Sequence, residues 1–230
     1  MSFPRRRATP FSLAIFDLDG TLVDSLPDIA RALNAALAEA GRRAFPLDEV
    51  RGFVGDGAAK LVQRALGPDG QADADAVDAM TARFRHLYAH HLHQETRAYP
   101  GVEAALRALA AAMPLAVVTN KPRELARPLL GALALDGFFA DVIGDGDGFA
   151  RKPAPDAGLW LLARHGATPA DTLVVGDGLP DLRFARALGA RAAAVTWGYV
   201  APDSLRAEQP AWLVDQPADL LRIAFSDAAT

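Results

Sequence analysis

The sequence predicts an α/β protein in which a doubly wound, parallel, Rossmann-like sheet carries a helical cap domain inserted after its first strand. Short apolar runs bounded by turn residues recur along the 230 residues, and helical patterns lie between most of them. Such runs suit strands that are buried on both faces, and strands that alternate with helices are typical of a parallel sheet. The region 25–97 interrupts this alternation, because it contains helical patterns and no convincing strand.

The expected elements follow one another along the chain. Strands are expected at 13–16, 115–118, 142–143, 173–175 and 192–195. Core helices are expected at 102–112, 123–133, 156–165 and 181–188, and cap helices at 27–40, 58–66 and 72–91. Pro100-Gly101 and Gly189 are typical start and stop signals of helices. The domains are therefore a flexible tail at 1–10, a core made of 11–24 and 98–230, and a cap at 25–97.

The composition narrows the class of protein. With 24 Lys and Arg against 28 Asp and Glu, the formal charge is −4, which gives no electrostatic reason to expect nucleic acid or an anionic membrane as a partner. The absence of Cys excludes disulfides, thiolate catalysis and a Cys-bound zinc. No stretch approaches the roughly 18 uninterrupted apolar residues of a membrane helix. We expect a cytoplasmic monomer or homodimer. The tryptophans follow apolar runs and are expected in the core: Trp160, Trp197 and Trp212.

Two carboxylates, Asp17 and Asp19, come directly after the first predicted strand. They project from the carboxyl end of that strand, where open α/β sheets bind ligands, and alternate positions of an extended chain share a face. Two like charges this close are costly unless a cation or a transferred proton relieves them, so the pair indicates a metal site, an acid–base role, or both. Gly20-Thr21 would let the backbone curl around an anion with its amides inward.

Further polar residues follow later predicted elements, at positions that a parallel sheet brings to the same edge. They are Thr119, Asn120, Lys152, Asp177 and Asp181. A hydroxyl and an amide can hold phosphoryl oxygens, a lysine can neutralise their charge, and a further carboxylate can complete the oxygen shell that Mg²⁺ prefers. A calcium-binding loop is not expected at Asp17, because Leu22 stands where that loop requires glycine.

Four motifs resemble those of the haloacid dehalogenase-like hydrolases, and the resemblance covers nearly the whole chain. The motifs are Asp17-Leu-Asp19-Gly-Thr21, Thr119, Lys152-Pro153 and Gly176-Asp177-x-x-x-Asp181. Within that superfamily, the segments 53–57, 99–102, 118–122 and 151–153 resemble the phosphoglycolate phosphatase branch, in which the helical insert is a mobile cap. The branch usually has Ser after the Asp of the fourth motif. Here Gly178 stands in that place, so a hydroxyl that would support the metal site is missing.

The resemblance implies a Mg²⁺-dependent phosphomonoester hydrolase that acts through an aspartyl-phosphate. Asp17 would attack the phosphorus as the nucleophile. Asp19 would protonate the leaving oxygen and then deprotonate the attacking water. Mg²⁺ would be held by Asp17, the backbone carbonyl of Asp19, and Asp177.

The same resemblance implies which residues hold the substrate. Thr119, Asn120 and the amides after Asp17, Gly20 among them, would bind phosphoryl oxygens. Lys152 would stabilise the charge that spreads over those oxygens in the transition state. Asp181 would orient Lys152 or a metal-bound water.

The cap would close over the site, exclude water and bring the groups that read the rest of the substrate. The segment 53–57 is a candidate for this role, and Lys60 or Arg51 could pair with a substrate carboxylate. The alternative is that 53–57 only forms a turn before a helix, with Asp56 as its N-cap.

The branch resemblance makes 2-phosphoglycolate the expected substrate, with glycolate and phosphate as products. The expected partner is thus a small phosphorylated metabolite. The alternatives are another small phosphate ester or pyrophosphate, a mutase of the same fold, and a non-catalytic binding protein of the same fold. Retention of Asp17, Asp19, Lys152 and Asp177 argues against a binding protein, which has no chemical need for both a nucleophile and an acid.

Overall fold

A sheet of six parallel strands forms the centre of the computed structural model, which describes residues 9–71 and 73–225, with the backbone alone at 68–71. The strand order is β5-β4-β1-β6-β7-β8, and every pairing is parallel. The strands are β1 (Leu13–Phe16), β4 (Leu115–Pro122), β5 (Asp141–Asp145), β6 (Thr172–Gly176), β7 (Arg191–Val195) and β8 (Trp212–Val214). β1 therefore lies between β4 and β6, at the centre of the sheet.

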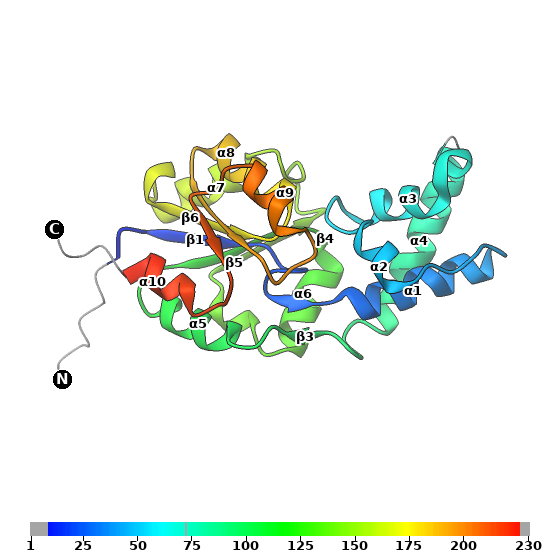
Figure 1. Cartoon of the computed structure of the whole chain (residues 1–230), viewed down its shortest axis with the longest axis horizontal. Helices are drawn as coiled ribbons and strands as arrows, with labels where there is room; N and C mark the ends of the chain where they lie inside the picture. Colours follow the sequence, from blue (N-terminus) through cyan, green and yellow to red (C-terminus); the bar gives the residue numbers. More distant parts are fainter. Residues whose placement is uncertain (1–8, 72, 226–230) are drawn as a thin grey trace.

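Helices cover both faces of this sheet (Figure 1). One layer contains α5 (Val102–Ala110), α6 (Arg123–Ala132) and α10 (Asp219–Phe225), and the other contains α7 (Asp156–His165), α8 (Leu179–Leu188) and α9 (Pro202–Ala207). Ala14 and Phe16 belong to the apolar cluster of the first layer, and Leu13 and Ile15 to that of the second. Because both faces of β1 are buried, its sequence is a continuous apolar run. The predicted doubly wound α/β fold is confirmed.

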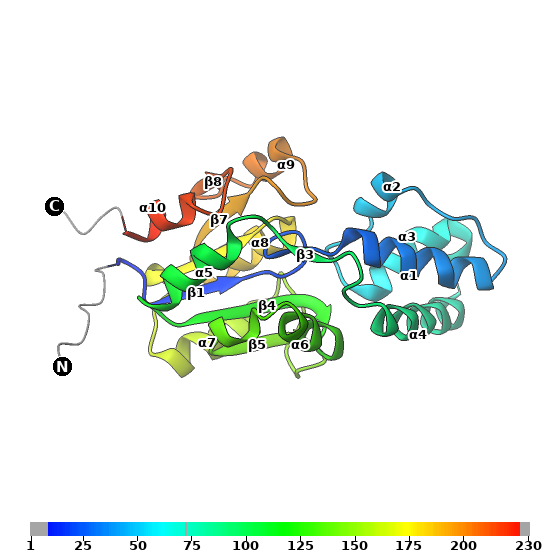
Figure 2. The ribbon, with the colours of Figure 1, turned by 90° about the horizontal axis from the view of Figure 1, so that it is seen from below.

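The cap helices lie together beyond one end of the sheet (Figures 1 and 2). They are α1 (Leu26–Glu39), α2 (Leu47–Arg51), α3 (Ala58–Gln71) and α4 (Ala74–His90). Two short strands, β2 (Val23–Asp24) and β3 (Arg97–Ala98), pair antiparallel where the chain passes from the core into the cap and back. The helical insertion after the first strand is thus confirmed. The predicted boundaries of the cap fall on this two-stranded ribbon.

Some elements differ from the predictions. The helix α2 and the strand β8 were missed, because segments of five and three residues carry too little periodicity to be recognised. The helix α3 continues beyond its predicted end, across a break at Gly67 where φ is +72°. The predicted core position of Trp160 is wrong: its side chain is 40% exposed, because α7 buries the stripe that contains Ala157 and Leu161 and Trp160 lies off that stripe.

Two further expectations from the sequence concern the N-terminal tail and membrane-spanning helices. Of the tail predicted at 1–10, residues 1–8 lie outside the described part of the chain. Within the part that is described, no helix is both long enough and apolar enough to cross a membrane.

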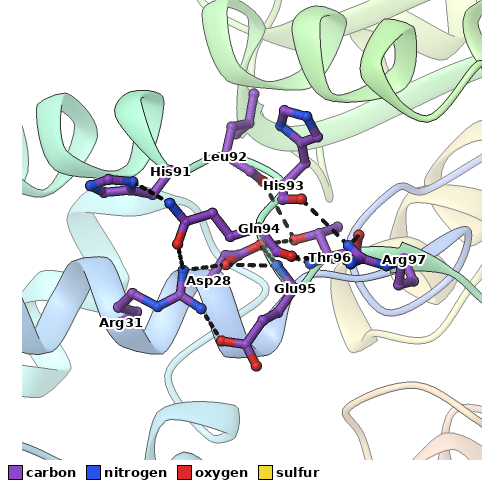
Figure 3. A network of polar contacts seen from close by, with 9 residues as sticks. All are labelled: Asp28, Arg31, His91, Leu92, His93, Gln94, Glu95, Thr96 and Arg97. Carbon is purple, nitrogen blue, oxygen red and sulfur yellow. Dashed lines mark hydrogen bonds and ion pairs between the residues drawn. The ribbon is translucent and has the colours of Figure 1, made fainter.

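A buried carboxylate ties together the segments that enter and leave the cap (Figure 3). Asp28, in the first turn of α1, is 0% exposed. It accepts hydrogen bonds from Glu95 N at 3.0 Å, Thr96 N at 2.8 Å and Thr96 Oγ1 at 2.7 Å, just before β3. Arg31 Nη1 lies 2.7 Å from Asp28 Oδ1 and adds a positive charge. A buried charge is costly without such partners, so these contacts fix the start of α1 against the returning chain.

Replacement of this carboxylate tests the role of the network. Burial alone would raise the pKa of Asp28, but the hydrogen bonds from Thr96 and Glu95 and the charge of Arg31 outweigh it and hold the pKa below its usual value. A lowered pKa stabilises the folded state above the unfolded-state pKa of about 4, and this contribution is lost as the pH falls through the lower folded-state pKa. Asp28→Asn should therefore destabilise the protein by about 2–3 kcal/mol at pH 7, because the amide would turn an N–H group toward backbone donors.

Urea unfolding at about pH 7 and about pH 3 measures the difference between wild type and Asp28→Asn, which should shrink at the lower pH because the unfolded wild-type chain binds a proton at Asp28 below its pKa of about 4. Asp48→Asn is a suitable control, because that side chain is 93% exposed. A difference of the same size at both pH values would contradict the assigned role of the ionised carboxylate.

Candidate active site

Three carboxylates converge at the carboxyl ends of β1 and β6. Asp17 directly follows β1, Asp177 directly follows β6, and Asp181 lies in the first turn of α8. Each can place one oxygen so that all three lie within 4.8 Å of one another. Asp177 and Asp181 are each 3% exposed. The convergence follows from the topology, since β1 and β6 are neighbouring parallel strands that end at the same edge of the sheet.

One lysine compensates part of this negative charge. Lys152 Nζ lies 2.7 Å from Asp17 Oδ1 and 2.6 Å from Asp181 Oδ1. Burial alone would lower the pKa of Lys152, but these two carboxylates raise it, so the ammonium group stays charged. Burial and the charge of Asp181 raise the pKa of Asp17 to about 6, against the opposing effect of Lys152. Three carboxylates around one ammonium group leave excess negative charge, which a divalent cation would relieve.

The residues of this cluster fit Mg²⁺. Asp17 Oδ1 is buried, and among the described residues its partner is the ammonium group of Lys152 at 2.7 Å, without an aligned hydrogen bond. Burial, with the charges of Asp181 and Asp17, raises the pKa of Asp177 well above its usual value. Carboxylate oxygens are ligands that Mg²⁺ prefers. Asp181 is engaged with Lys152 through Oδ1 and with Gly178 N through Oδ2, an arrangement that suits a residue orienting the lysine.

Asp177 is held in place without any contribution from a side chain at position 178. Thr21 Oγ1 donates to Asp177 Oδ1 at 2.9 Å, and the backbone N–H of Tyr199 donates to Oδ2 at 2.8 Å. The glycine at 178 therefore leaves these supports of Asp177 intact. Gly20 allows the close approach of this carboxylate, because a Cβ there would lie 2.3 Å from Asp177 Oδ2 and the backbone φ is +87°.

A cavity of about 60 Å³ lies between this cluster and the cap. Asp17, Asp19 and Thr119 line its core side, and apolar side chains such as Leu61 and Phe84 line its cap side. A water molecule needs roughly 10–15 Å³ of such space, so the cavity accommodates a ligand about the size of four to six waters. Thr119 Oγ1 accepts a hydrogen bond from Lys121 N at 3.2 Å and keeps its own proton to donate to a ligand.

The sequence matches a known family. The family model for haloacid dehalogenase-like hydrolases matches residues 14–195. The chain belongs to this family. A protein of Pseudomonas putida named phosphoglycolate phosphatase is 40% identical over 214 residues, which cover 91% of this chain and 78% of that protein. A protein of the same name from Nitrosospira multiformis is 39% identical over 203 residues, which cover 86% of this chain and 87% of that protein.

Solved structures agree with this membership. The crystal structure of a predicted phosphoglycolate phosphatase from Haemophilus somnus superimposes with a TM-score of 0.84 at 34% sequence identity, over 94% of this chain and 98% of that one. This haloacid dehalogenase-like hydrolase therefore shares its cap as well as its core with solved relatives, because the match extends over both.

Two predicted substrate ligands are placed differently from the expectation. The backbone N–H of Gly20 donates to Val23 O at 2.8 Å, so this amide is not free to bind a phosphoryl oxygen. The side chain of Asn120 is also engaged, because Nδ2 donates to Gly55 O and to Lys152 O, each at 3.1 Å, and Oδ1 accepts from Lys152 N at 2.9 Å. Asn120 thus positions the loop that carries Lys152 and connects it to the cap.

Of the cap residues expected to contact the substrate, some line the cavity and others do not. Gly55 and Gly57, from the segment 53–57, line the cavity. Arg51 and Lys60 are exposed and are not among the residues that line it. The side chain of Asp56 forms an ion pair with Arg64, and Gly57 is the residue that precedes α3, so the alternative of Asp56 as an N-cap is wrong.

Lys121 also lies in this site, although no sequence motif predicts a role for it. Lys121 Nζ lies 2.9 Å from Asp19 Oδ1 and 3.1 Å from Oδ2, and its other partner is Tyr88 OH at 2.7 Å, from the cap helix α4. Asp19 also accepts a hydrogen bond from Ser25 Oγ, at the entrance to the cap. The available signal was the position of Lys121 directly after Thr119 and Asn120, but the sequence does not show that its side chain turns inward.

Mg²⁺ is expected to raise the melting temperature of this hydrolase by about 5–10 °C. A ligand at a hundredfold excess over its Kd stabilises the folded state by roughly 2.7 kcal/mol, and each kcal/mol corresponds to about 2–4 °C for a chain of this size. Asp177→Asn should remove most of the shift. Asp203→Asn should retain it, because Asp203 is 94% exposed. Calorimetry with and without Mg²⁺ measures both, and an undiminished shift in Asp177→Asn would contradict the assigned metal site.

Proposed function

We propose that this hydrolase is a Mg²⁺-dependent phosphoric monoester hydrolase that converts 2-phosphoglycolate and water into glycolate and phosphate. The observation that carries the proposal is the position of Asp17, which lies in the wall of a small cavity, 2.7 Å from the ammonium group of Lys152 and two residues before a second carboxylate, Asp19. The names of the relatives from Pseudomonas putida and Nitrosospira multiformis support the choice of substrate.

The first half-reaction transfers the phosphoryl group to Asp17. A carboxylate oxygen of Asp17 attacks the phosphorus, the bond from phosphorus to the ester oxygen breaks, and an aspartyl-phosphate forms. Asp19 donates its proton to the departing oxygen, which leaves as the hydroxyl of glycolate. Lys152 and the hydroxyl of Thr119 contact the phosphoryl oxygens, where charge accumulates in the transition state.

The second half-reaction restores Asp17. Asp19, now ionised, takes a proton from a water molecule as that water attacks the phosphorus. The bond from phosphorus to the Asp17 oxygen breaks, phosphate leaves, and both carboxylates return to their starting protonation states. The apolar side chains of the cap exclude other water molecules while the phospho-enzyme exists.

The residues that would hold Mg²⁺ are Asp17, Asp177 and the backbone carbonyl of Asp19. When bound, the cation neutralises the repulsion between the attacking carboxylate and the phosphate dianion. The excess negative charge of the carboxylate cluster and its raised pKa values support this assignment.

Replacement of the two aspartates of the first motif tests the mechanism. Asp17→Asn should reduce phosphate release to background, because no nucleophile remains. Asp19→Asn should lower kcat by about 100- to 10,000-fold, the usual contribution of a general acid. Phosphate release in the presence of Mg²⁺ is the measurement, with Asp203→Asn as a surface control and circular dichroism to show that each variant folds. Activity retained by Asp17→Asn would exclude the aspartyl-phosphate route.

The substrate is tested by kcat/KM, because discrimination between substrates depends on that ratio. We expect 2-phosphoglycolate to exceed pyrophosphate, 3-phosphoglycerate, sugar phosphates and nucleotides, because the cavity of about 60 Å³ suits a small ester. A higher kcat/KM for another compound would keep the mechanism and replace the substrate. Turnover of none of them by folded protein with Mg²⁺ would instead favour a binding protein of the same fold.

A further inference from the structure

Lys121 is a buried cation in the wall of the cavity. It lies near the end of β4 and is 6% exposed. Among the described residues that line the cavity, Lys121 is the one with a positively charged side chain. A buried ammonium group is costly unless it is paired, and the carboxylate of Asp19 and the hydroxyl of Tyr88 provide that pairing.

The position of Lys121 relative to Asp19 determines which part of the substrate it meets. Asp19 must come within roughly 2.6–3.2 Å of the ester oxygen in order to protonate it. Lys121 Nζ is 2.9 Å from a carboxylate oxygen of the same Asp19. The chemical group attached to the ester oxygen must therefore lie beside Lys121. In 2-phosphoglycolate that group is a carboxylate, separated from the ester oxygen by a single carbon.

The rest of this wall offers a carboxylate little else to bind. Leu61, Phe84 and Leu125 line the cavity with apolar surface, which strengthens any charge–charge interaction inside it. Arg64 and Arg151 are paired with Asp56 and Asp145.

We propose that Lys121 binds the carboxylate of the substrate and so selects phosphate esters that carry an acid group one carbon from the ester oxygen. This inference rests on the function proposed above, since it concerns the same cavity and the same Asp19. The sequence suggested that Lys60 or Arg51 of the cap pairs with the substrate carboxylate; here a residue of the core takes that role.

Tyr88 from α4 holds the ammonium group in position. Its hydroxyl lies 2.7 Å from Lys121 Nζ, and the ammonium group lies 4.4 Å from the centre of the Tyr88 ring. Burial raises the pKa of Tyr88 to about 12, so the hydroxyl stays neutral at physiological pH. An ammonium group has three N–H donors. Asp19 and Tyr88 supply two acceptor groups, and the substrate carboxylate is the third.

The experiment compares two esters that differ at the group in question. Ethyl phosphate has the same CH₂–O–P skeleton as 2-phosphoglycolate, with a methyl group in place of the carboxylate. The ratio of kcat/KM for 2-phosphoglycolate to kcat/KM for ethyl phosphate should fall by about 10- to 150-fold in Lys121→Met, the range expected for one charge-assisted hydrogen bond. Lys121→Arg should keep most of the ratio, because it keeps the charge. Lys60→Met is a matched control, because Lys60 is exposed and outside the cavity.

The ratio of the two kcat/KM values distinguishes binding of the substrate carboxylate by Lys121 from positioning of Asp19 by Lys121. Loss of contact with Asp19 would slow both esters equally, so an unchanged ratio in Lys121→Met overturns the proposal. Lys121→Gln, which keeps a donor without the charge, repeats the comparison if the Met variant does not fold. A wild-type enzyme that hydrolyses both esters equally well contradicts the proposed substrate and this inference together. A wild-type preference that survives in Lys121→Met contradicts the role of Lys121 alone.

Discussion

The convergence of three carboxylates, two of them paired with one ammonium group, is the constraint on which the site depends. It requires the backbone to pass very close to the aspartates, and glycines occur at those points. A Cβ at Gly198 would lie 2.2 Å from the Cβ of Asp177, and a Cβ at Gly176 would lie 2.3 Å from the Cβ of Asp181. The neighbouring strands β1 and β6 bring the charges together, and the loop held by Asn120 brings Lys152 to them. The parallel sheet and its glycine-containing turns thus form a scaffold that keeps like charges close until a cation and a phosphate reach them.

The connection between core and cap is fixed by a strand pair and a buried carboxylate. The ribbon of β2 and β3 brings the two crossing segments together, and Asp28 binds the backbone of Glu95 and Thr96 on the cap side of that ribbon. Both crossings are therefore tied at this point. The same crossing carries Ser25, whose hydroxyl contacts Asp19. The crossing between core and cap is therefore linked to the active site by a hydrogen bond.

The fold could be predicted from the sequence, and so could the gathering of charged residues at one edge of the sheet, because both follow from local patterns. Apolar runs such as Leu13–Phe16 show burial directly, and Asp17, Asp177 and Lys152 stand at the ends of such runs or in motifs with a chemical signature. The predictions failed where a role depends on the direction of a side chain or an amide. Nothing local shows that Lys121 turns into the cavity while Lys60 stays exposed, or that the Gly20 amide bonds Val23. These are consequences of tertiary packing, which one sequence does not display.

The two aspartates of the first motif depend on different parts of the molecule, although they are two residues apart. Asp17 is set by the core, because Lys152 lies in the loop between β5 and α7 and pairs both with Asp17 and with Asp181 of α8. Asp19 is set at the boundary with the cap: Ser25, between β2 and α1, donates a hydrogen bond to it, and Lys121 contacts it while bound to Tyr88 of α4. Of the contacts of these two aspartates, the one that comes from a cap helix is thus made through Asp19. In the proposed reaction, the general acid is therefore positioned jointly by core and cap, since Lys121 contacts Asp19 and Tyr88 at the same time.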